Sequence, residues 1–298
     1  MKLIVLAGPT GTGKSALALR LAQVLAGEIV NYDSVQVYRG FDIGSAKPSA
    51  KERSVVPHHL YDIVDADQEF NAASYVKVAR EVCSQLHTAI LVGGTFFYLR
   101  ALLSGLPEMP GRDEEVRARI RAIAWKPRGA ERLHRWLSKI DPRSGRTIAP
   151  GDRHRVERAL EVWLASGRPI SSWERGGDDE LPAIKIALTL DRARLAEVLD
   201  RRVDAMFAAG LVEETRALLQ RYPAAARPFG TIGYKEAAAV VRGELALDAA
   251  IAETKRRTRA YAKRQMTWLR SERNVHWLDA SDKDETFAAA LRLIEVES

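Results

Sequence analysis

Over the first hundred residues, short apolar runs alternate with stretches whose apolar residues recur every three or four positions. Short apolar runs are typical of buried strands, and the longer period is typical of helices packed on a sheet. This alternation indicates an α/β fold, a parallel sheet flanked by helices that binds ligands at the carboxyl ends of its strands. The elements expected here are strands at 2–7, 28–32 and 89–92 and helices at 14–26, about 71–86 and about 96–104.

Beyond residue 104 the pattern changes. Residues 105–111 are rich in glycine and proline and indicate a linker. The chain then reads as helical at 113–175, a loop at 175–179, a strand at 183–190 and helices at about 193–208, 210–221 and 246–271. We therefore predict a P-loop core with a helical insertion domain: 1–116 is the first part of the core, 117–180 the insertion, and 181–298 the second, mainly helical part of the core.

The turn after the first apolar run carries the strongest motif. It consists of Gly8, Pro9, Thr10, Gly11, Thr12, Gly13, Lys14 and Ser15, and fits the P-loop pattern G-x-x-x-x-G-K-[ST]. The glycines let backbone N–H groups turn inward around a polyphosphate, and the following helix directs its positive end at the anion. Lys14 adds a charge, and Ser15 offers a hydroxyl to Mg²⁺. The sequence therefore predicts a nucleotide-like di- or triphosphate site with Mg²⁺.

The strand expected at 89–92 ends without a carboxylate. P-loop enzymes that transfer a phosphoryl group usually place an Asp there to hold magnesium, whereas this chain continues with Gly93-Gly94-Thr95. The nearest acid after a strand is Asp33. It is a candidate general base or magnesium ligand, although Asp-Ser in this place is also a common helix cap, and Gln36 nearby can read a base edge bidentately. These features predict that the loop holds a pyrophosphate leaving group, rather than a γ-phosphate that is transferred.

Composition narrows the class of protein. With 298 residues, 46% apolar and 29% charged, the chain is an ordinary globular protein with one cysteine, Cys83, which excludes an internal disulfide. No segment approaches the roughly 20 apolar residues that cross a bilayer, so we expect a cytoplasmic protein without membrane association. We also expect the protein to act as a monomer.

Positive charge is concentrated in two regions. Residues 111–176 hold 16 Lys or Arg against 9 Asp or Glu, and residues 253–273 hold 8 against 2. Such regions on a phosphate-binding protein indicate a polyanionic partner, and nucleic acid is the obvious candidate. On charge alone, helix faces with partly paired charges explain the excess equally well.

Seven motifs together resemble the tRNA dimethylallyltransferase family. They are Gly8 to Ser15, Asp33 to Pro48, Pro57 to Asp62, Leu91 to Thr95, Asp152 to Glu161, Gly233 to Glu236 and Thr258 to Gln265. Members move a dimethylallyl group from dimethylallyl diphosphate to the exocyclic amine of the adenosine on the 3′ side of the tRNA anticodon. The resemblance thus implies tRNA and dimethylallyl diphosphate as partners and explains the missing acid, because no phosphoryl group is transferred.

The resemblance also implies residue roles. Asp33 is the expected general base, and Thr95 donates to the bridging oxygen of the diphosphate bound at residues 8–15. The residues implied to contact tRNA are Asp33, Ser34, Val35, Gln36, Thr95, Arg117, His154, Arg155, Val156, Glu157 and Arg158. Arg155 and Arg158, three positions apart, suit a phosphate backbone.

Several positions depart from the family's pattern. After Thr95 the family usually has Gly-Leu, whereas Phe96 and Phe97 stand here; Phe96 narrows the prenyl channel, or both rings belong to the core of the next helix. His154 replaces a common Gln. Gly230 stands where some members have a phosphate-facing Arg, for which Arg227 is a candidate substitute.

A zinc site is not expected. His58 and His59 are adjacent, but the chain has one cysteine and no further clustered histidines. The single cysteine also rules out the C-terminal zinc finger of eukaryotic relatives.

Three other functions compete with tRNA prenylation. A nucleoside or small-molecule kinase is the default for a P-loop domain but lacks the magnesium-binding acid here. An isopentenyltransferase acting on free adenine nucleotides needs no RNA, which the basic regions disfavour. A non-catalytic RNA-binding protein does not account for Lys14, Ser15 and Asp33 together.

Overall fold

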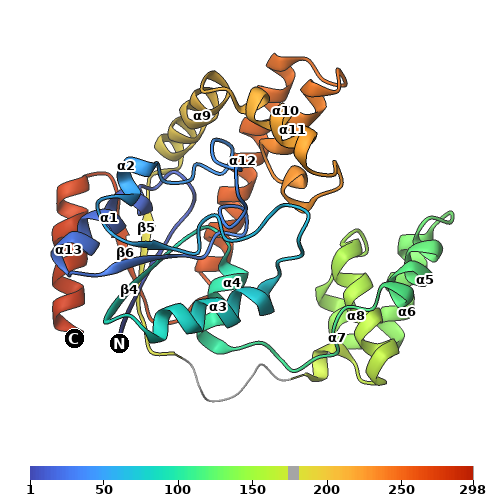
Figure 1. Cartoon of the computed structure of the whole chain (residues 1–298). Helices are drawn as coiled ribbons and strands as arrows, with labels where there is room; N and C mark the ends of the chain where they lie inside the picture. The colour runs from blue at the N-terminus through green and yellow to red at the C-terminus, as the bar shows by residue number, and fades with distance from the viewer. Residues whose placement is uncertain (174–180, 298) are drawn as a thin grey trace. The chain divides into compact units, whose positions relative to one another are not determined.

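The computed structural model describes residues 1–173 and 181–297, and these form two compact units. One unit consists of 1–103 with 181–298, and the other of 104–180 (Figure 1). The second unit therefore begins at Ser104, whereas the sequence analysis placed the insertion at 117–180. The loop expected at 175–179 lies outside the described residues.

The first unit is built on a parallel sheet. In the described part of the chain its six strands lie in the order β3-β2-β4-β1-β5-β6, and every neighbouring pair is parallel. Their bounds are β1 Lys2–Ala7, β2 Glu28–Asn31, β3 His58–His59, β4 Thr88–Val92, β5 Ile184–Thr189 and β6 Val275–Asp279. Central β1 is apolar and buried from Leu3 to Ala7, as expected for a strand covered on both faces. The predicted α/β fold class is confirmed.

Helices flank this sheet and supply the other walls of the unit (Figure 1). Their bounds are α1 Lys14–Val24, α2 Ala50–Arg53, α3 Ala72–Ser84, α4 Phe96–Ser104, α9 Arg192–Ala208, α10 Leu211–Arg221, α11 Tyr234–Val241, α12 Leu247–Leu269 and α13 Lys283–Val296, with a 3₁₀ turn at Arg227–Gly230. Helices α1 and α13 pack against each other, and their apolar faces join the strands in one core. Helices α9 and α11 both pack on α12.

Five elements of this unit were not predicted. Strand β6 lies at the sheet edge with no fully buried residue, so it lacks the continuous apolar run that identified β1. Strand β3 has only two residues, α2 has four and α11 has eight, and α13 follows an edge strand that was itself missed. Short or half-exposed elements carry too few periodic positions to be recognised.

The second unit is helical. It contains α5 Glu114–Ala124, α6 Gly129–Ile140, α7 Pro142–Thr147, α8 Arg153–Ser166 and a 3₁₀ turn at Ile170–Ser172. Its own core includes Ile120, Leu133, Leu137 and Leu160. The helical pattern predicted for 113–175 is therefore correct for the described part of that segment. Across the described residues of both units, no helix is long and apolar enough to cross a membrane.

Candidate active site

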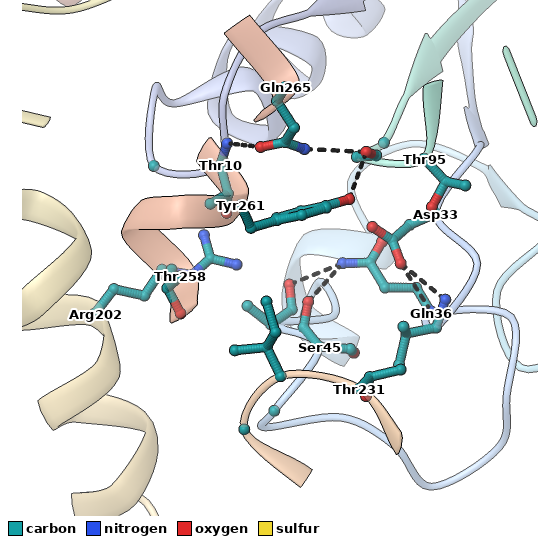
Figure 2. Close-up of a pocket in the computed structure, with 18 of the residues that line it drawn as sticks. Thr10, Asp33, Gln36, Ser45, Thr95, Arg202, Thr231, Thr258, Tyr261 and Gln265 are labelled. Carbon is teal, nitrogen blue, oxygen red and sulfur yellow. Dashed lines mark hydrogen bonds between the residues drawn. The ribbon is translucent and has the colours of Figure 1, made fainter. Parts of the chain in front are cut away.

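Three loops meet at the carboxyl end of the sheet. They follow β1, β2 and β4, and carry the P-loop, Asp33 and the turn Gly93–Thr95. Together with residues of α9 and α12 they line a pocket of about 500 Å³ (Figure 2). The pocket lies where an open α/β sheet places its ligand site.

The P-loop presents unpaired backbone donors to this pocket. Gly11 and Gly13 have φ of 88° and 84°, a left-handed conformation that side chains rarely adopt. Within the part of the chain that the structure describes, the N–H groups of Gly13, Lys14 and Ser15 have no acceptor. They surround the N-terminus of α1, where the helix dipole favours an anion.

Lys14 is buried within the loop it belongs to. Its ammonium donates to the carbonyl oxygens of Gly8, at 2.9 Å, and Pro9, at 2.8 Å. Burial, which is the larger cause, and the charge of Arg202 together lower the pKa of Lys14 to about 7, although Asp33 acts in the opposite direction. An anion that binds here restores the preference for the charged form.

Asp33 is fixed by its own turn. Its N–H donates to Asn31 Oδ1 at 2.8 Å, and its Oδ1 accepts from the N–H of Val35 at 2.8 Å. Burial raises the pKa of Asp33, although the N–H groups of Val35 and Gln36 and the positive charge of Lys14 act against that rise. A carboxylate with a raised pKa is a stronger base than an exposed one.

Thr95 is joined to the Asp33 turn through Ser34. The N–H of Ser34 donates to Thr95 Oγ1, and that hydroxyl donates to Ser34 Oγ, both at 3.0 Å. The structure thus brings Asp33, Ser34, Val35, Gln36 and Thr95 to the same pocket as Lys14 and Ser15. Because its proton is used by Ser34, Thr95 must rotate to donate to a bound ligand.

Helix α12 ties two of these loops together. Gln265 accepts from the N–H of Thr10 at 2.9 Å and donates to the carbonyl of Gly94 at 3.0 Å (Figure 2). Tyr261 donates to the same carbonyl at 2.8 Å. The motif 258–265 was recognised in the sequence, but its role was not, because no local pattern reveals a contact between residues so distant in sequence.

Gly94 is needed at its position. A Cβ there would lie 3.0 Å from Asp33 Oδ2 and 3.2 Å from Gln265 Nε2, which is closer than ordinary van der Waals contact. The turn therefore packs directly against the carboxylate.

Arg202 is the principal site residue that the sequence analysis missed. It extends from α9 into the pocket (Figure 2), burial lowers its pKa, and Asp33 opposes that shift. Its guanidinium has no hydrogen-bond acceptor among the residues described. Arg227, the expected substitute, instead donates to the carbonyl of Phe70 at 2.8 Å and does not line the pocket, so that expectation is wrong.

In the helical unit, two of the arginines implied to contact tRNA bind an internal carboxylate. Arg117 donates to both oxygens of Glu161, at 2.8 and 3.1 Å, and Arg158 donates to the same carboxylate at 2.7 Å. Arg158 also donates to the carbonyl of Pro110 at 2.7 Å. The Glu161 side chain is fully buried, and this network holds its pKa down to about 2. Arg117 and Arg158 therefore stabilise the unit.

The remaining residues of that motif divide by exposure. Val156 is 2% exposed, and its side chain packs in the unit's core. Glu157 accepts from Arg121 at 2.8 Å. His154 and Arg155 are exposed, and the Arg155 side chain retains 66% of its accessible surface. Among residues 154–158, those two side chains are the most exposed and therefore the most accessible to a partner.

The two phenylalanines after Thr95 have different fates. Phe96 is 5% exposed and stacks on Trp268, with ring centroids 4.7 Å apart. It does not line the pocket, and its burial places it in the core against which α4 packs. Phe97 is 62% exposed and therefore not part of that core.

The oxygen ligands in the pocket suit magnesium better than zinc. No group of three or more His, Cys, Asp or Glu side chains converges among the residues described. Magnesium in phosphate sites takes one or two protein oxygens and completes its shell with phosphate and water. Ser15 and Asp33, both at the pocket wall, fit that kind of binding.

Fold and site together define a P-loop α/β protein with a helical insertion, and comparison with known proteins identifies the family. The family model described as IPP transferase matches residues 36–272, and the isopentenyl transferase model matches 1–62. The chain belongs to the IPP transferase family, which confirms the resemblance inferred from the motifs.

Individual relatives agree over nearly the whole length. The tRNA dimethylallyltransferase of Geobacter metallireducens is 44% identical, with 97% of this chain and 96% of the relative covered. The crystal structure of a tRNA isopentenylpyrophosphate transferase from Bacillus halodurans has a TM-score of 0.72 and 36% identity, with 99% and 97% covered. A structure of a eukaryotic dimethylallyltransferase acting on tRNA has a TM-score of 0.76 and 28% identity, with 98% and 77% covered.

Proposed function

We propose that the protein transfers the dimethylallyl group of dimethylallyl diphosphate to N6 of the adenosine on the 3′ side of the tRNA anticodon, releasing pyrophosphate. One observation carries this proposal: a P-loop and a partly buried carboxylate share a pocket, while β4 is followed by Gly93-Gly94-Thr95 with no acid. That combination suits a diphosphate that departs from carbon and a base that removes a proton.

Asp33 is the base in this scheme. As N6 bonds to C1 of the prenyl group, the bond from C1 to the diphosphate oxygen breaks and N6 must lose a proton. Asp33 Oδ1 is occupied by the backbone of its own turn, which leaves Oδ2 to receive that proton. The raised pKa of the carboxyl favours the transfer.

The cations and amides of the pocket stabilise the leaving group. Charge grows on the diphosphate as the carbon–oxygen bond breaks, and fixed donors aimed at that charge lower the barrier. Lys14, Arg202 and the N–H groups at the start of α1 supply them. Thr95 donates to the bridging oxygen once it rotates away from Ser34.

Mg²⁺ is the expected cofactor. When bound with the diphosphate it supplies further positive charge against the leaving group. Ser15, which lines the pocket, would offer its hydroxyl to the ion.

The acceptor is a base in RNA, which must leave its stack to reach the pocket. We assign phosphate contacts of the insertion to Arg155, with His154 beside it, because both side chains are exposed. We expect the protein to act as a monomer in the cytoplasm, where tRNA is found.

Nucleoside mass spectrometry tests the proposal. Purified protein is incubated with an unmodified tRNA transcript, dimethylallyl diphosphate and Mg²⁺, and the tRNA is digested. N6-dimethylallyladenosine at the position next to the anticodon is expected, and no product without the donor. Phosphoryl transfer from ATP to a nucleoside, with no prenylated nucleoside, would make the protein a kinase.

A further inference from the structure

Gln36 has its amide orientation fixed by a neighbouring loop. Nε2 donates to the carbonyl of Ser45 at 3.0 Å and to the carbonyl of Ala46 at 3.2 Å (Figure 2). A Gln amide has two N–H donors, so both are used. The amide oxygen points away from these partners because the group is planar, and it has no donor among the described residues.

The loop that supplies the two carbonyls is itself held in place. Lys47, with 1% of its side chain exposed, donates to the carbonyl of Tyr38 at 2.8 Å and pairs with Asp42 at 2.6 Å and Asp62 at 2.5 Å. The Ser45 hydroxyl donates to the carbonyl of Phe41 at 2.6 Å. Turning the Gln36 amide over would set its oxygen against two carbonyl oxygens that cannot move away.

This geometry overturns the bidentate reading expected from the sequence. A Gln that reads adenine on two atoms donates to N7 and accepts from the exocyclic amine. In this pocket the donors are occupied, and only the acceptor remains. Gln36 can pair with an N–H group and cannot pair with N1, N7 or a carbonyl oxygen of a base.

We propose that Gln36 selects the acceptor base through its amide oxygen alone, by accepting a hydrogen bond from the exocyclic amine. The inference rests on the proposed function. An amine carries two hydrogens, of which Asp33 receives one during transfer; Gln36 holds the one that stays. The two residues share one turn, in which the N–H of Gln36 donates to Asp33 Oδ1 at 3.4 Å. A base with a carbonyl at the same position would set oxygen against oxygen, so guanine and hypoxanthine are rejected.

Anticodon stem–loop RNAs separate this reading from the bidentate one. One RNA carries adenosine at the target position and the other 7-deazaadenosine, which lacks the N7 acceptor. Loss of one neutral hydrogen bond of about 1.4 kcal/mol should lower kcat/KM of Gln36→Leu about tenfold, and by the same factor on both RNAs. Gln85→Leu, an exposed glutamine at the end of α3, is the matched control and should be unchanged.

The possible results distinguish an error in the role given to Gln36 from an error in the proposed function. A tenfold loss on adenosine that disappears on 7-deazaadenosine would show that Gln36 reads N7, and no loss on either RNA would remove Gln36 from recognition. Pyrophosphate inhibition of Gln36→Leu should stay within twofold of wild type; a larger loss would mean that the substitution acts by disturbing the pocket. If wild-type enzyme prenylates neither RNA, the proposed function itself fails.

Discussion

The pocket and the helical insertion each place two cations near one carboxylate, with opposite results. In the insertion, Arg117 and Arg158 bond directly to buried Glu161, whose pKa falls to about 2. In the pocket, no ion pair among the described residues joins Lys14 or Arg202 to Asp33, and burial raises the pKa of that carboxyl.

Whether the cations bond directly to the carboxylate therefore decides whether the cluster is structural or functional. Cations that bond to a carboxylate neutralise it and fix the fold, because each partner satisfies the other. Cations held apart from it leave the carboxylate basic and keep their own charge for a ligand. The first arrangement is structural, and the second is suited to binding an anion beside a base.

The largest effect is expected at the basic carboxylate. Asp33→Asn keeps the size of the side chain but cannot accept a proton as a carboxylate does, so the single-turnover rate should fall by roughly 10²–10⁴-fold. Affinity for tRNA, measured by filter binding, should stay within a few-fold of wild type. A variant whose transfer rate is nearly normal would exclude Asp33 as the base.

The corresponding substitution of the carboxylate in the insertion, Glu161→Gln, should lower the stability of the fold instead of the transfer rate. Glu161→Gln removes the carboxylate that Arg117 and Arg158 share and leaves Arg117 with Glu157 at 3.7 Å. The free energy of unfolding should therefore fall by about 3 kcal/mol in chemical denaturation. Exposed Glu115→Gln is the control and should stay within about 0.5 kcal/mol of wild type. Equal stability of the two variants would refute the structural role.

This carboxylate also gives a pH dependence with a definite sign. Folding lowers the pKa of Glu161 from its ordinary 4.5 to about 2, so its contribution to stability is full above pH 4.5. The contribution is lost as pH falls from 4.5 toward 2, because the unfolded chain binds the proton first. Glu161→Gln should remove this part of the acid sensitivity.

Arg202 tests whether the pocket's cations are held for an anion. Loss of a charged hydrogen-bond donor, about 1.5–3 kcal/mol, should weaken pyrophosphate inhibition of Arg202→Met by roughly 10- to 150-fold. Arg201→Met removes the same charge from the neighbouring exposed position of α9 and should have no effect. If both variants bind pyrophosphate equally well, Arg202 makes no direct contact with the anion and contributes only to the net positive charge of the protein.

The smallest effect is expected at the exposed arginine of the insertion. Arg155→Gln should leave the unfolding free energy unchanged and reduce the slope of log affinity for tRNA against log salt by about 0.7–0.9, the value for one phosphate contact. An unchanged slope would remove Arg155 from the RNA interface.

The sequence predicts those strands, helices and site residues that are specified by neighbouring residues along the chain. The apolar runs identify central β1 and β4, and the P-loop motif places Lys14 and Ser15 at the start of α1. Asp33 and Thr95 follow strands whose carboxyl ends meet, so their convergence also follows from the alternation of elements.

What the sequence could not predict depends on long-range contact. Arg202 lies on an amphipathic helix among other charged residues, and no spacing distinguishes it from exposed Arg201. Arg117 and Arg155 read alike as basic residues, but only the fold brings Glu161 to the first. The orientation of the Gln36 amide depends on carbonyls nine and ten residues away.

The choice of acceptor tests most directly the claim that the protein prenylates tRNA. Initial rates of prenyl transfer are measured with wild-type enzyme, dimethylallyl diphosphate and Mg²⁺, using unmodified tRNA or adenosine monophosphate as acceptor at equal concentration. We predict that tRNA is prenylated faster, because the insertion contributes binding that a mononucleotide cannot use. Faster prenylation of adenosine monophosphate would contradict it and make the protein an enzyme of free nucleotides.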